Sequence, residues 1–223
     1  MSLPQRQGDY EVQFQVHKQS SNLFFITMKR VMDVILSCIA CVVISPLLLL
    51  LWILIKIEEP GAPGIYRQIR VGKDGKPFEM YKFRSMVRDA EARQQDLLHK
   101  NEIQGAMFKM KNDPRVTPIG RIIRRTSLDE LPQLFNVIRG EMSLVGPRPP
   151  LPREVNEYTS YDLQRLTVIP GCTGLWQVSG RNQLGFKEMV ELDLQYIRKQ
   201  SIRFDLLILL KTVRVLVGTK DAF

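Results

Sequence analysis

The longest apolar stretch of the chain covers residues 34–55, which contain no charged side chain and are mostly valine, isoleucine and leucine. As a helix, these twenty-two residues would extend about 33 Å, close to the roughly 30 Å of a bilayer's hydrocarbon core. The stretch is too long for a secretory signal and lacks a small-residue cleavage site. A buried core helix is the alternative, which the length of the stretch disfavours. The pattern therefore predicts a helix in a membrane.

A proline interrupts this stretch near its middle. Pro46 cannot donate a hydrogen bond to the carbonyl of Val42, and the hydroxyl of Ser45 is placed to bind that carbonyl instead. Two interpretations follow: a kinked helix that spans the bilayer, or a re-entrant helix that bends at Ser45-Pro46 and leaves by the same face. Basic residues flank the stretch on both sides, at 29–30 and at 56. Because positive charge stays on the cytoplasmic side, these flanks favour the re-entrant helix.

After Pro60 the pattern becomes that of a globular domain. Alternating apolar and polar positions at 65–71 and 77–83 enclose a Gly-Lys-Asp-Gly turn and predict a β-hairpin. Three later segments have helical patterns, namely 89–101, 127–140 with Gly140 as its end, and an amphipathic 205–217 that packs on the core or lies at the membrane surface. The alternation at 10–16 suits one further strand.

These segments predict an α+β fold that is mainly helical. A re-entrant membrane helix, a small β-hairpin and amphipathic interfacial helices would surround one compact domain. The expected plan is an N-terminal extension at 1–27, whose role is open, the re-entrant helix at 28–57 and a cytoplasm-facing domain at 58–223.

Charge and composition exclude several chemistries. The formal charge is +9, from 32 lysines and arginines against 23 acids, which suits nucleic acid, an anionic membrane or a phosphate-bearing substrate. The two histidines are isolated, so a zinc cluster and a histidine-based triad are excluded, and no glycine-rich nucleotide motif is present. Cys38 and Cys41 form a C-x-x-C within apolar sequence, where we interpret them as lipid- or helix-facing side chains. Carboxylates and arginines remain for the chemistry.

The strongest candidate site surrounds Asp129 and Glu130. Ser127 and Glu130 match a capping box, so a helix start is the bland interpretation of this segment. In the functional interpretation, a helix N-terminus beside Arg124 and Arg125 would bind phosphate oxygens together with a divalent cation. A carboxylate held there could act as a nucleophile or a metal ligand.

Other basic residues stand where the backbone is constrained. Arg148 lies within Gly-Pro-Arg-Pro, Arg181 follows Ser-Gly, and Lys82 and Arg84 come at the end of the predicted hairpin. A solvated basic face is the ordinary explanation for scattered arginines. Flanking proline and glycine instead favour side chains that are aimed at a ligand.

Five strings of this sequence together resemble one family. They are KFRSM at 82–86, RRTSLDELPQ at 124–133, SLVGPRP at 143–149, PGCTGLWQVSGR at 170–181 and LDLQYI at 192–197. From about residue 28 to its end, the chain resembles the bacterial sugar transferases, the monotopic polyprenol-phosphate phosphoglycosyl transferases. It fits the short form, essentially the catalytic core. Cys172 departs from the pattern, and we interpret it as a packing substitution.

The resemblance implies an activity and its residues. A UDP-sugar would give its sugar-1-phosphate to undecaprenyl phosphate and release UMP, as the first membrane step of surface glycoconjugate synthesis. Asp129 would be the nucleophile that forms a phosphoglycosyl-aspartate, and Asp129 and Glu130 would hold Mg²⁺. The substrate- and phosphate-binding residues implied are Lys82, Arg84, Arg124, Arg148, Arg181, Asp193 and Tyr196.

The resemblance also implies a location. The break at Ser45-Pro46 matches the family's helix break and supports a monotopic protein on the cytoplasmic face of the bacterial inner membrane. The expected partners are a UDP-sugar, undecaprenyl phosphate and membrane lipid, without nucleic acid. A homodimer, the sugar and the pathway are left open. Two rival functions remain: a membrane-bound basic module that recruits acidic partners, and a non-catalytic scaffold with this fold.

Overall fold

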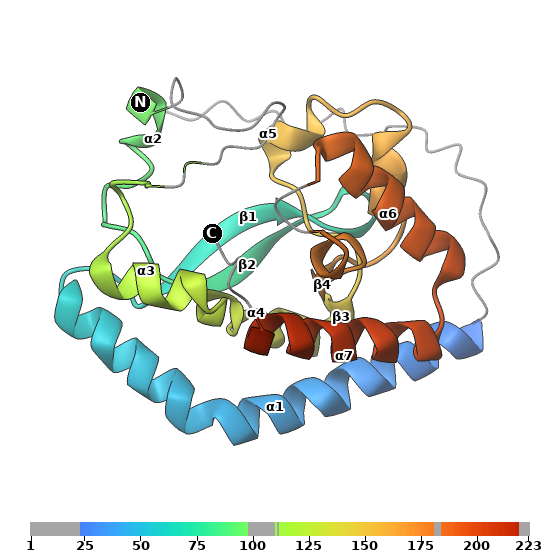
Figure 1. Cartoon of the computed structure of the whole chain (residues 1–223), viewed down its shortest axis with the longest axis horizontal. Coiled ribbons are helices and arrows are strands. Elements are labelled where there is room, and N and C mark those ends of the chain that lie inside the picture. The colour runs from blue at the N-terminus through green and yellow to red at the C-terminus, as the bar shows by residue number, and fades with distance from the viewer. Residues whose placement is uncertain (1–22, 98–109, 111, 181–183, 219–223) are drawn as a thin grey trace.

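The computed structural model describes residues 23–97, 110, 112–180 and 184–218 (Figure 1). A long bent helix, α1 (Leu23–Glu58), runs along one side of the molecule, and the remaining helices and strands lie on its concave side. In the described residues the structure is mainly helical with two small sheets, which confirms the α+β prediction. The strand expected at 10–16 lies outside the described residues.

Helix α1 is long and apolar enough to cross a membrane, judged by its length and composition. It extends beyond the expected 28–57 at both ends. The Ser45 hydroxyl donates to the Val42 carbonyl over 2.8 Å, which confirms the partner expected for the carbonyl that Pro46 cannot bind. Both limbs of the bent helix rise toward the rest of the protein (Figure 1). Its buried side chains belong to those limbs: Asp33, Ser37, Leu51 and Ile55.

The predicted hairpin is confirmed residue by residue. Strands β1 (Ile65–Val71) and β2 (Pro77–Phe83) pair antiparallel, with Ile65 opposite Phe83 and Val71 opposite Pro77. Asp74 and Gly75 take positive φ angles of 56° and 76° in the turn. This geometry explains the Asp-Gly pair, because aspartate tolerates the left-handed region and glycine adopts it without strain.

A second, parallel pair of strands lies deeper in the protein. Strands β3 (Ser143–Val145) and β4 (Gly171–Thr173) are short, and Gly146 continues the pairing by donating to Thr173 O over 2.9 Å. A Cβ atom on Gly171 would lie 2.0 Å from the Gly146 nitrogen, so only glycine permits this close approach.

Helices fill the remainder of the fold. They are α2 (Gln94–Leu97), α3 (Pro118–Arg125), α4 (Gln133–Arg139), α5 (Pro152–Val155), α6 (Phe186–Lys199) and α7 (Ile202–Gly218), with 3-10 turns between several of them. Within the predicted helix 89–101 only α2 is helical, and residues 98–101 lie outside the described part of the chain. The amphipathic helix predicted at 205–217 corresponds to α7.

The helix expected to open at Ser127 starts later, and its capping box is wrong. Ser127 has a left-handed φ of 56° and its side chain makes no capping hydrogen bond. A single 3-10 turn, η3 (Leu128–Glu130), follows, and α4 begins only after Pro132. The reason is that Pro132 has no N–H to bind the carbonyl of Leu128, so regular helix starts beyond it. Gly140 ends α4 with a φ of 88°, as predicted.

Two apolar clusters hold the elements together. The larger one lies among β2, α4, β3, α6 and α7, and its buried members are Met80, Val137, Met142, Leu144, Val145, Leu175, Tyr196 and Ile208. The smaller one joins the second limb of α1 to α3 and β2 through Leu51, Ile55, Phe83 and Ile123. Helix α1 is thus packed against the globular part of the protein and also exposes most of its apolar surface.

Candidate active site

The dyad turn, which we define as η3 with Asp129 and Glu130, lies between α3 and α4 and contacts β2. Lys82, near the end of β2, donates its ammonium to Glu130 Oε1 over 2.7 Å. The Glu130 side chain is 40% exposed and that of Lys82 21% exposed, so the pair is accessible to a ligand. The left-handed Ser127 and Pro132 bracket the turn, so its backbone is fixed on both sides.

The two carboxyl groups of the dyad turn have different electrostatic surroundings. Burial raises the pKa of Asp129 to about 6, Glu130 adds to that rise, and Lys82 and Arg124 oppose it. For Glu130, burial alone would raise the pKa, but the charge and hydrogen bond of Lys82, with the charges of Arg148 and Arg70, together lower it. Glu130 therefore stays ionised beside Lys82, whereas Asp129 takes up a proton at a higher pH than an ordinary aspartate does.

Arg148 approaches the dyad from the loop that follows β3. Its Nη1 lies 3.3 Å from Glu154 Oε2, and the Glu154 side chain is 2% exposed. Glu154 is held in turn because its Oε2 accepts the Leu151 N–H over 2.8 Å. The charge of Arg148 helps to lower the pKa of Glu130, so the arginine lies close enough to act on the dyad.

The charge of Arg70, a residue that the sequence analysis did not select, also helps to lower the pKa of Glu130. Arg70 lies near the end of β1, on the same face of the strand as Gln68, and it is 6% exposed. Its guanidinium donates to Gln68 Oε1 over 2.6 and 3.0 Å and to the Pro149 carbonyl over 2.9 Å. Burial and the nearby Arg148 lower its pKa to about 9. The sequence did offer one sign of it, because Arg70 occupies a position of the alternating strand whose side chain faces the protein interior.

Comparison with known proteins identifies the family. The family model described as "Bacterial sugar transferase" matches residues 24–219. The chain belongs to the bacterial sugar transferase family. It is 47% identical over 196 residues to the galactosyl transferase CpsE of Streptococcus agalactiae, covering 86% of this chain and 42% of that protein. It is 43% identical over 216 residues to the undecaprenyl-phosphate galactose phosphotransferase of Salmonella typhimurium, covering 95% and 44%.

A shorter relative matches over most of its length. The exopolysaccharide production protein ExoY of Rhizobium meliloti is 42% identical over 199 residues, which cover 87% of this chain and 88% of that protein. This sugar transferase chain therefore spans less than half of the two longer relatives and most of the shorter one.

For the other predicted site residues of the sugar transferase, the link to the dyad turn is weaker than for Lys82. Arg124 lies in the last turn of α3, and its charge lowers the pKa of Asp129. Arg84 donates to the Pro63 carbonyl over 2.9 Å and lies 5.6 Å from the centre of the Tyr66 ring. Arg181 lies outside the described residues.

Asp193 and Tyr196 are both inside the protein. Asp193 is fully buried, and Arg165 donates to its Oδ2 over 2.6 and 2.8 Å. Burial raises the pKa of Asp193 to about 6, whereas Arg165 and Arg148 lower it. Tyr196 is 1% exposed and its hydroxyl contacts Val145 O and Asp205. Neither side chain reaches the surface, and both are engaged by other residues of the protein.

The donor chemistry of the dyad turn fits magnesium. Among the described residues no cluster of three or more histidine, cysteine, aspartate or glutamate side chains is suited to hold a metal. Magnesium is usually held by one or two carboxylates together with waters and substrate phosphates, which is what adjacent Asp129 and Glu130 offer. Cys172 packs partly buried against the larger apolar cluster, and burial followed by the charge of Glu130 raises its thiol pKa, so it remains a thiol.

Proposed function

We propose that this sugar transferase moves a sugar-1-phosphate from a UDP-sugar to undecaprenyl phosphate and releases UMP. The observation that carries the proposal is the Lys82–Glu130 ion pair beside Asp129, with Arg148 and Arg124 acting on the same carboxyls. The names of the relatives support it. The Salmonella relative is an undecaprenyl-phosphate galactose phosphotransferase, and an Escherichia coli relative, 40% identical, is a UDP-glucose:undecaprenyl-phosphate glucose-1-phosphate transferase.

The first step would be attack by Asp129. A carboxylate oxygen of Asp129 forms a bond to the sugar-linked phosphorus, and the bond from that phosphorus to the bridging oxygen breaks. UMP leaves with the electron pair, and a sugar-phosphoryl aspartate remains. A pyrophosphate repels an anionic nucleophile, so cations such as Lys82 and Arg148 are needed to neutralise its oxygens.

The second step would release Asp129 from the intermediate as a free carboxylate. A phosphate oxygen of undecaprenyl phosphate attacks the same phosphorus, and the bond between that phosphorus and Asp129 breaks. The products are undecaprenyl-diphospho-sugar and an ionised Asp129. Division of the exchange in this way means that the two anionic substrates need not react with one another directly. We propose that Asp129 and Glu130 hold Mg²⁺, which when bound supplies further positive charge to the phosphate oxygens.

The structure also supports a location at one membrane face. The limbs of α1 on either side of Ser45-Pro46 both contact the globular part of the protein, as a re-entrant helix requires. Helix α7, which lies beside α1 in Figure 1, exposes Leu206, Leu207, Leu210 and Val213. Such a surface suits the lipid headgroup boundary. We propose that this face rests on the cytoplasmic leaflet of the inner membrane, where both substrates can reach Asp129.

One assay tests the reaction. Purified protein in lipid nanodiscs with undecaprenyl phosphate and Mg²⁺ is incubated with UDP-glucose, UDP-galactose and their N-acetylated forms, and released UMP is measured. We expect release from at least one donor, loss of that release in Asp129→Asn, and full release in the control Asp96→Asn, an exposed site in α2. Substantial turnover by Asp129→Asn contradicts the nucleophile. Salt-dependent DNA binding without UMP release from any donor favours the basic recruitment module.

A further inference from the structure

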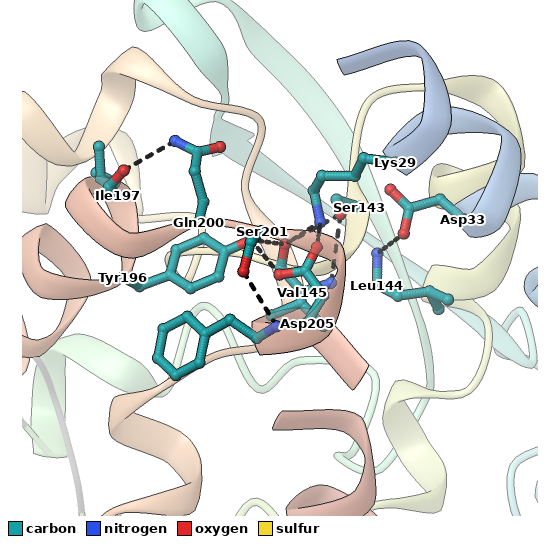
Figure 2. Close-up of polar contacts among 11 residues, drawn as sticks. Lys29, Asp33, Ser143, Leu144, Val145, Tyr196, Ile197, Gln200, Ser201 and Asp205 are labelled. Carbon is teal, nitrogen blue, oxygen red and sulfur yellow. Dashed lines mark hydrogen bonds and ion pairs between the residues drawn. The ribbon is translucent and has the colours of Figure 1, made fainter. Parts of the chain in front are cut away.

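The carbonyl oxygen of Val145 is the centre of a polar network that joins four elements (Figure 2). Lys29 of α1 donates its ammonium to this oxygen over 3.0 Å, and the Tyr196 hydroxyl of α6 also lies 3.0 Å from it. Asp205 of α7 accepts from Lys29 over 2.5 Å, and its Oδ1 lies 2.8 Å from the Tyr196 hydroxyl, whose single proton is shared between this oxygen and that of Val145. We call Lys29, Tyr196, Asp205 and the Val145 carbonyl the positioning clamp.

The positioning clamp is inside the protein. The Asp205 side chain is fully buried, the Lys29 side chain is 13% exposed and Tyr196 is 1% exposed. A buried ion pair is stable only when its geometry is good and its remaining donors and acceptors are satisfied, which is what Tyr196 and Val145 provide here. Such a network has one favourable arrangement, so it fixes the relative positions of the elements that contribute to it.

Two further side chains of α1 extend the attachment. Asp33, one turn beyond Lys29, accepts the N–H of Leu144 over 3.2 Å. Arg30 donates to the carbonyls of Val137 and Ile138 at the end of α4. The charged turn of α1 therefore binds strand β3 and also the helix that follows the dyad turn.

The clamp lies only three residues before Arg148. Gly146 and Pro147 connect Val145 to Arg148, and both are held by backbone hydrogen bonds to β4, from Gly146 N to Thr173 O over 2.9 Å and from Gly171 N to Pro147 O over 2.8 Å. Prolines on either side of Arg148 restrict its backbone further. A short and restrained segment therefore joins Val145 to Arg148, whose charge acts on Glu130.

We propose that Tyr196 and the Lys29–Asp205 pair are positioning residues that hold β3 so that Arg148 meets the substrate phosphate beside the dyad turn. This inference rests on the proposed function for its kinetic consequence and on the clamp geometry for its structural one. It gives Tyr196 a place in the reaction that involves no contact with substrate. It also makes correct docking of α1 a requirement for catalysis, since one member of the clamp belongs to that helix.

The kinetic test removes one hydroxyl. Tyr196→Phe keeps the ring and its stacking on Phe204, whose centroid lies 6.0 Å away. Because misplacement of a binding group by about 1 Å can cost up to about a hundredfold in rate, we expect Tyr196→Phe to lower kcat/KM for UMP release about tenfold. Residues that act through one another are non-additive. In an Arg148→Ala background the same substitution should therefore change kcat/KM less than about twofold.

The matched control is Tyr161→Phe. The Tyr161 hydroxyl contacts Glu191 over 2.6 Å on the protein surface, so this substitution also removes one hydrogen-bonding hydroxyl. It should leave kcat/KM within about twofold in both backgrounds. An equal loss for Tyr196→Phe with and without Arg148 would overturn the proposal, because that result means that Tyr196 acts on stability alone.

A second readout does not require activity. Hydrogen exchange of the amides of Leu144, Val145, Gly146 and Arg148 is measured by mass spectrometry in both tyrosine variants. We expect at least about tenfold faster exchange in Tyr196→Phe and no change in Tyr161→Phe. Unchanged exchange in Tyr196→Phe would overturn the clamp. If the unsubstituted protein releases no UMP from any donor, the proposed function fails, and the exchange result still decides the clamp.

Discussion

Lys82 Nζ lies 2.7 Å from Glu130 Oε1, which joins strand β2 to the dyad turn across 48 residues of sequence. The pair shows how the hairpin contributes to the site, since β2 ends at the point where Lys82 can reach the carboxylate. It also helps to keep Glu130 ionised, because burial raises the pKa of Glu130 and Lys82, together with Arg148 and Arg70, more than offsets that rise.

Removal of this cation should impair catalysis strongly. Lys82→Met leaves Glu130 without its partner and removes positive charge from the phosphate site, so we expect kcat/KM for UMP release to fall roughly 10²–10³-fold. Lys82→Arg should retain more activity than Lys82→Met. Lys73→Met, at an exposed position in the hairpin turn, is the control and should behave as the unsubstituted protein. Activity of Lys82→Met within threefold of that protein would contradict the assignment.

The left-handed backbone at Ser127 gives a prediction about stability. Glycine accepts this conformation without the cost of about 1–2 kcal/mol borne by other residues, which offsets its greater freedom in the unfolded chain. Ser127→Gly should therefore leave the free energy of unfolding unchanged or raise it by up to about 1 kcal/mol. A β-branched residue is more strongly disfavoured there, so Ser127→Val should lower it by roughly 1–3 kcal/mol. Denaturant unfolding measures both; a clear loss in Ser127→Gly would favour a capping role.

The bend of α1 predicts the side of the membrane on which the chain's beginning lies. With Cys38, Cys41 and Cys172 replaced by alanine, a single cysteine introduced by Ser2→Cys should react with an impermeant thiol reagent from the cytoplasmic side. Pro46→Leu restores the missing helix hydrogen bond and removes the cause of the bend, so labelling should shift toward the opposite side. Val43→Leu, an exposed position on the same helix, is the control. Labelling of the Pro46-containing protein only from outside would exclude a re-entrant helix.

The pKa of Asp193 makes stability depend on pH in a defined direction. Burial raises it to about 6 in the folded protein, against about 3.9 in an unfolded chain. Between these values the folded state binds the proton that the unfolded state has lost, so stability falls as pH rises from about 4 to about 6. The contribution is roughly 3 kcal/mol over that interval.

The control for this dependence is a neutral side chain of the same shape. Asp193→Asn is less stable overall because Arg165 loses its buried partner, but its stability should decline less between pH 4 and 6, where Asp129, whose pKa is also raised to about 6, still contributes. Thermal unfolding of both proteins across this range, with Asp96→Asn beside them, measures the difference. If the stabilities of Asp193→Asn and of the unsubstituted protein change in parallel with pH, the role assigned to Asp193 is contradicted.

The sequence predicted local features best. The hairpin was accessible because its alternation and its Asp74-Gly75 turn are both short-range signals, and the Ser45–Val42 hydrogen bond follows from the position of one proline. The parallel β3–β4 pair could not be predicted, since two three-residue strands from distant segments carry no periodicity. The start of α4 was placed too early because Ser127 and Glu130 match a capping box, whereas the regular helix begins only after Pro132.

The site was predicted in its centre and less so in its surroundings. Asp129, Glu130, Lys82 and Arg148 stand in motifs that the family resemblance singles out, and the structure brings Lys82 and Glu130 into contact. Arg70 and Arg165 were not selected because neither lies in such a motif. The partners of Tyr196 could not be found either, since its hydroxyl contacts Asp205, which also binds Lys29, and no local pattern encodes the packing of these three helices.

The ion pair between Lys29 and Asp205 has a consequence for biogenesis. Its members are 176 residues apart, so the ribosome, at about 5–20 residues per second, needs roughly 10–35 s to make Asp205 after Lys29. Throughout that interval Lys29 is present on α1, the helix that we propose to lie in the membrane, but its partner Asp205 has not yet been made. Lys29 therefore stays among lipid headgroups and water during that time, and α1 can dock at its final depth only after α7 has been made.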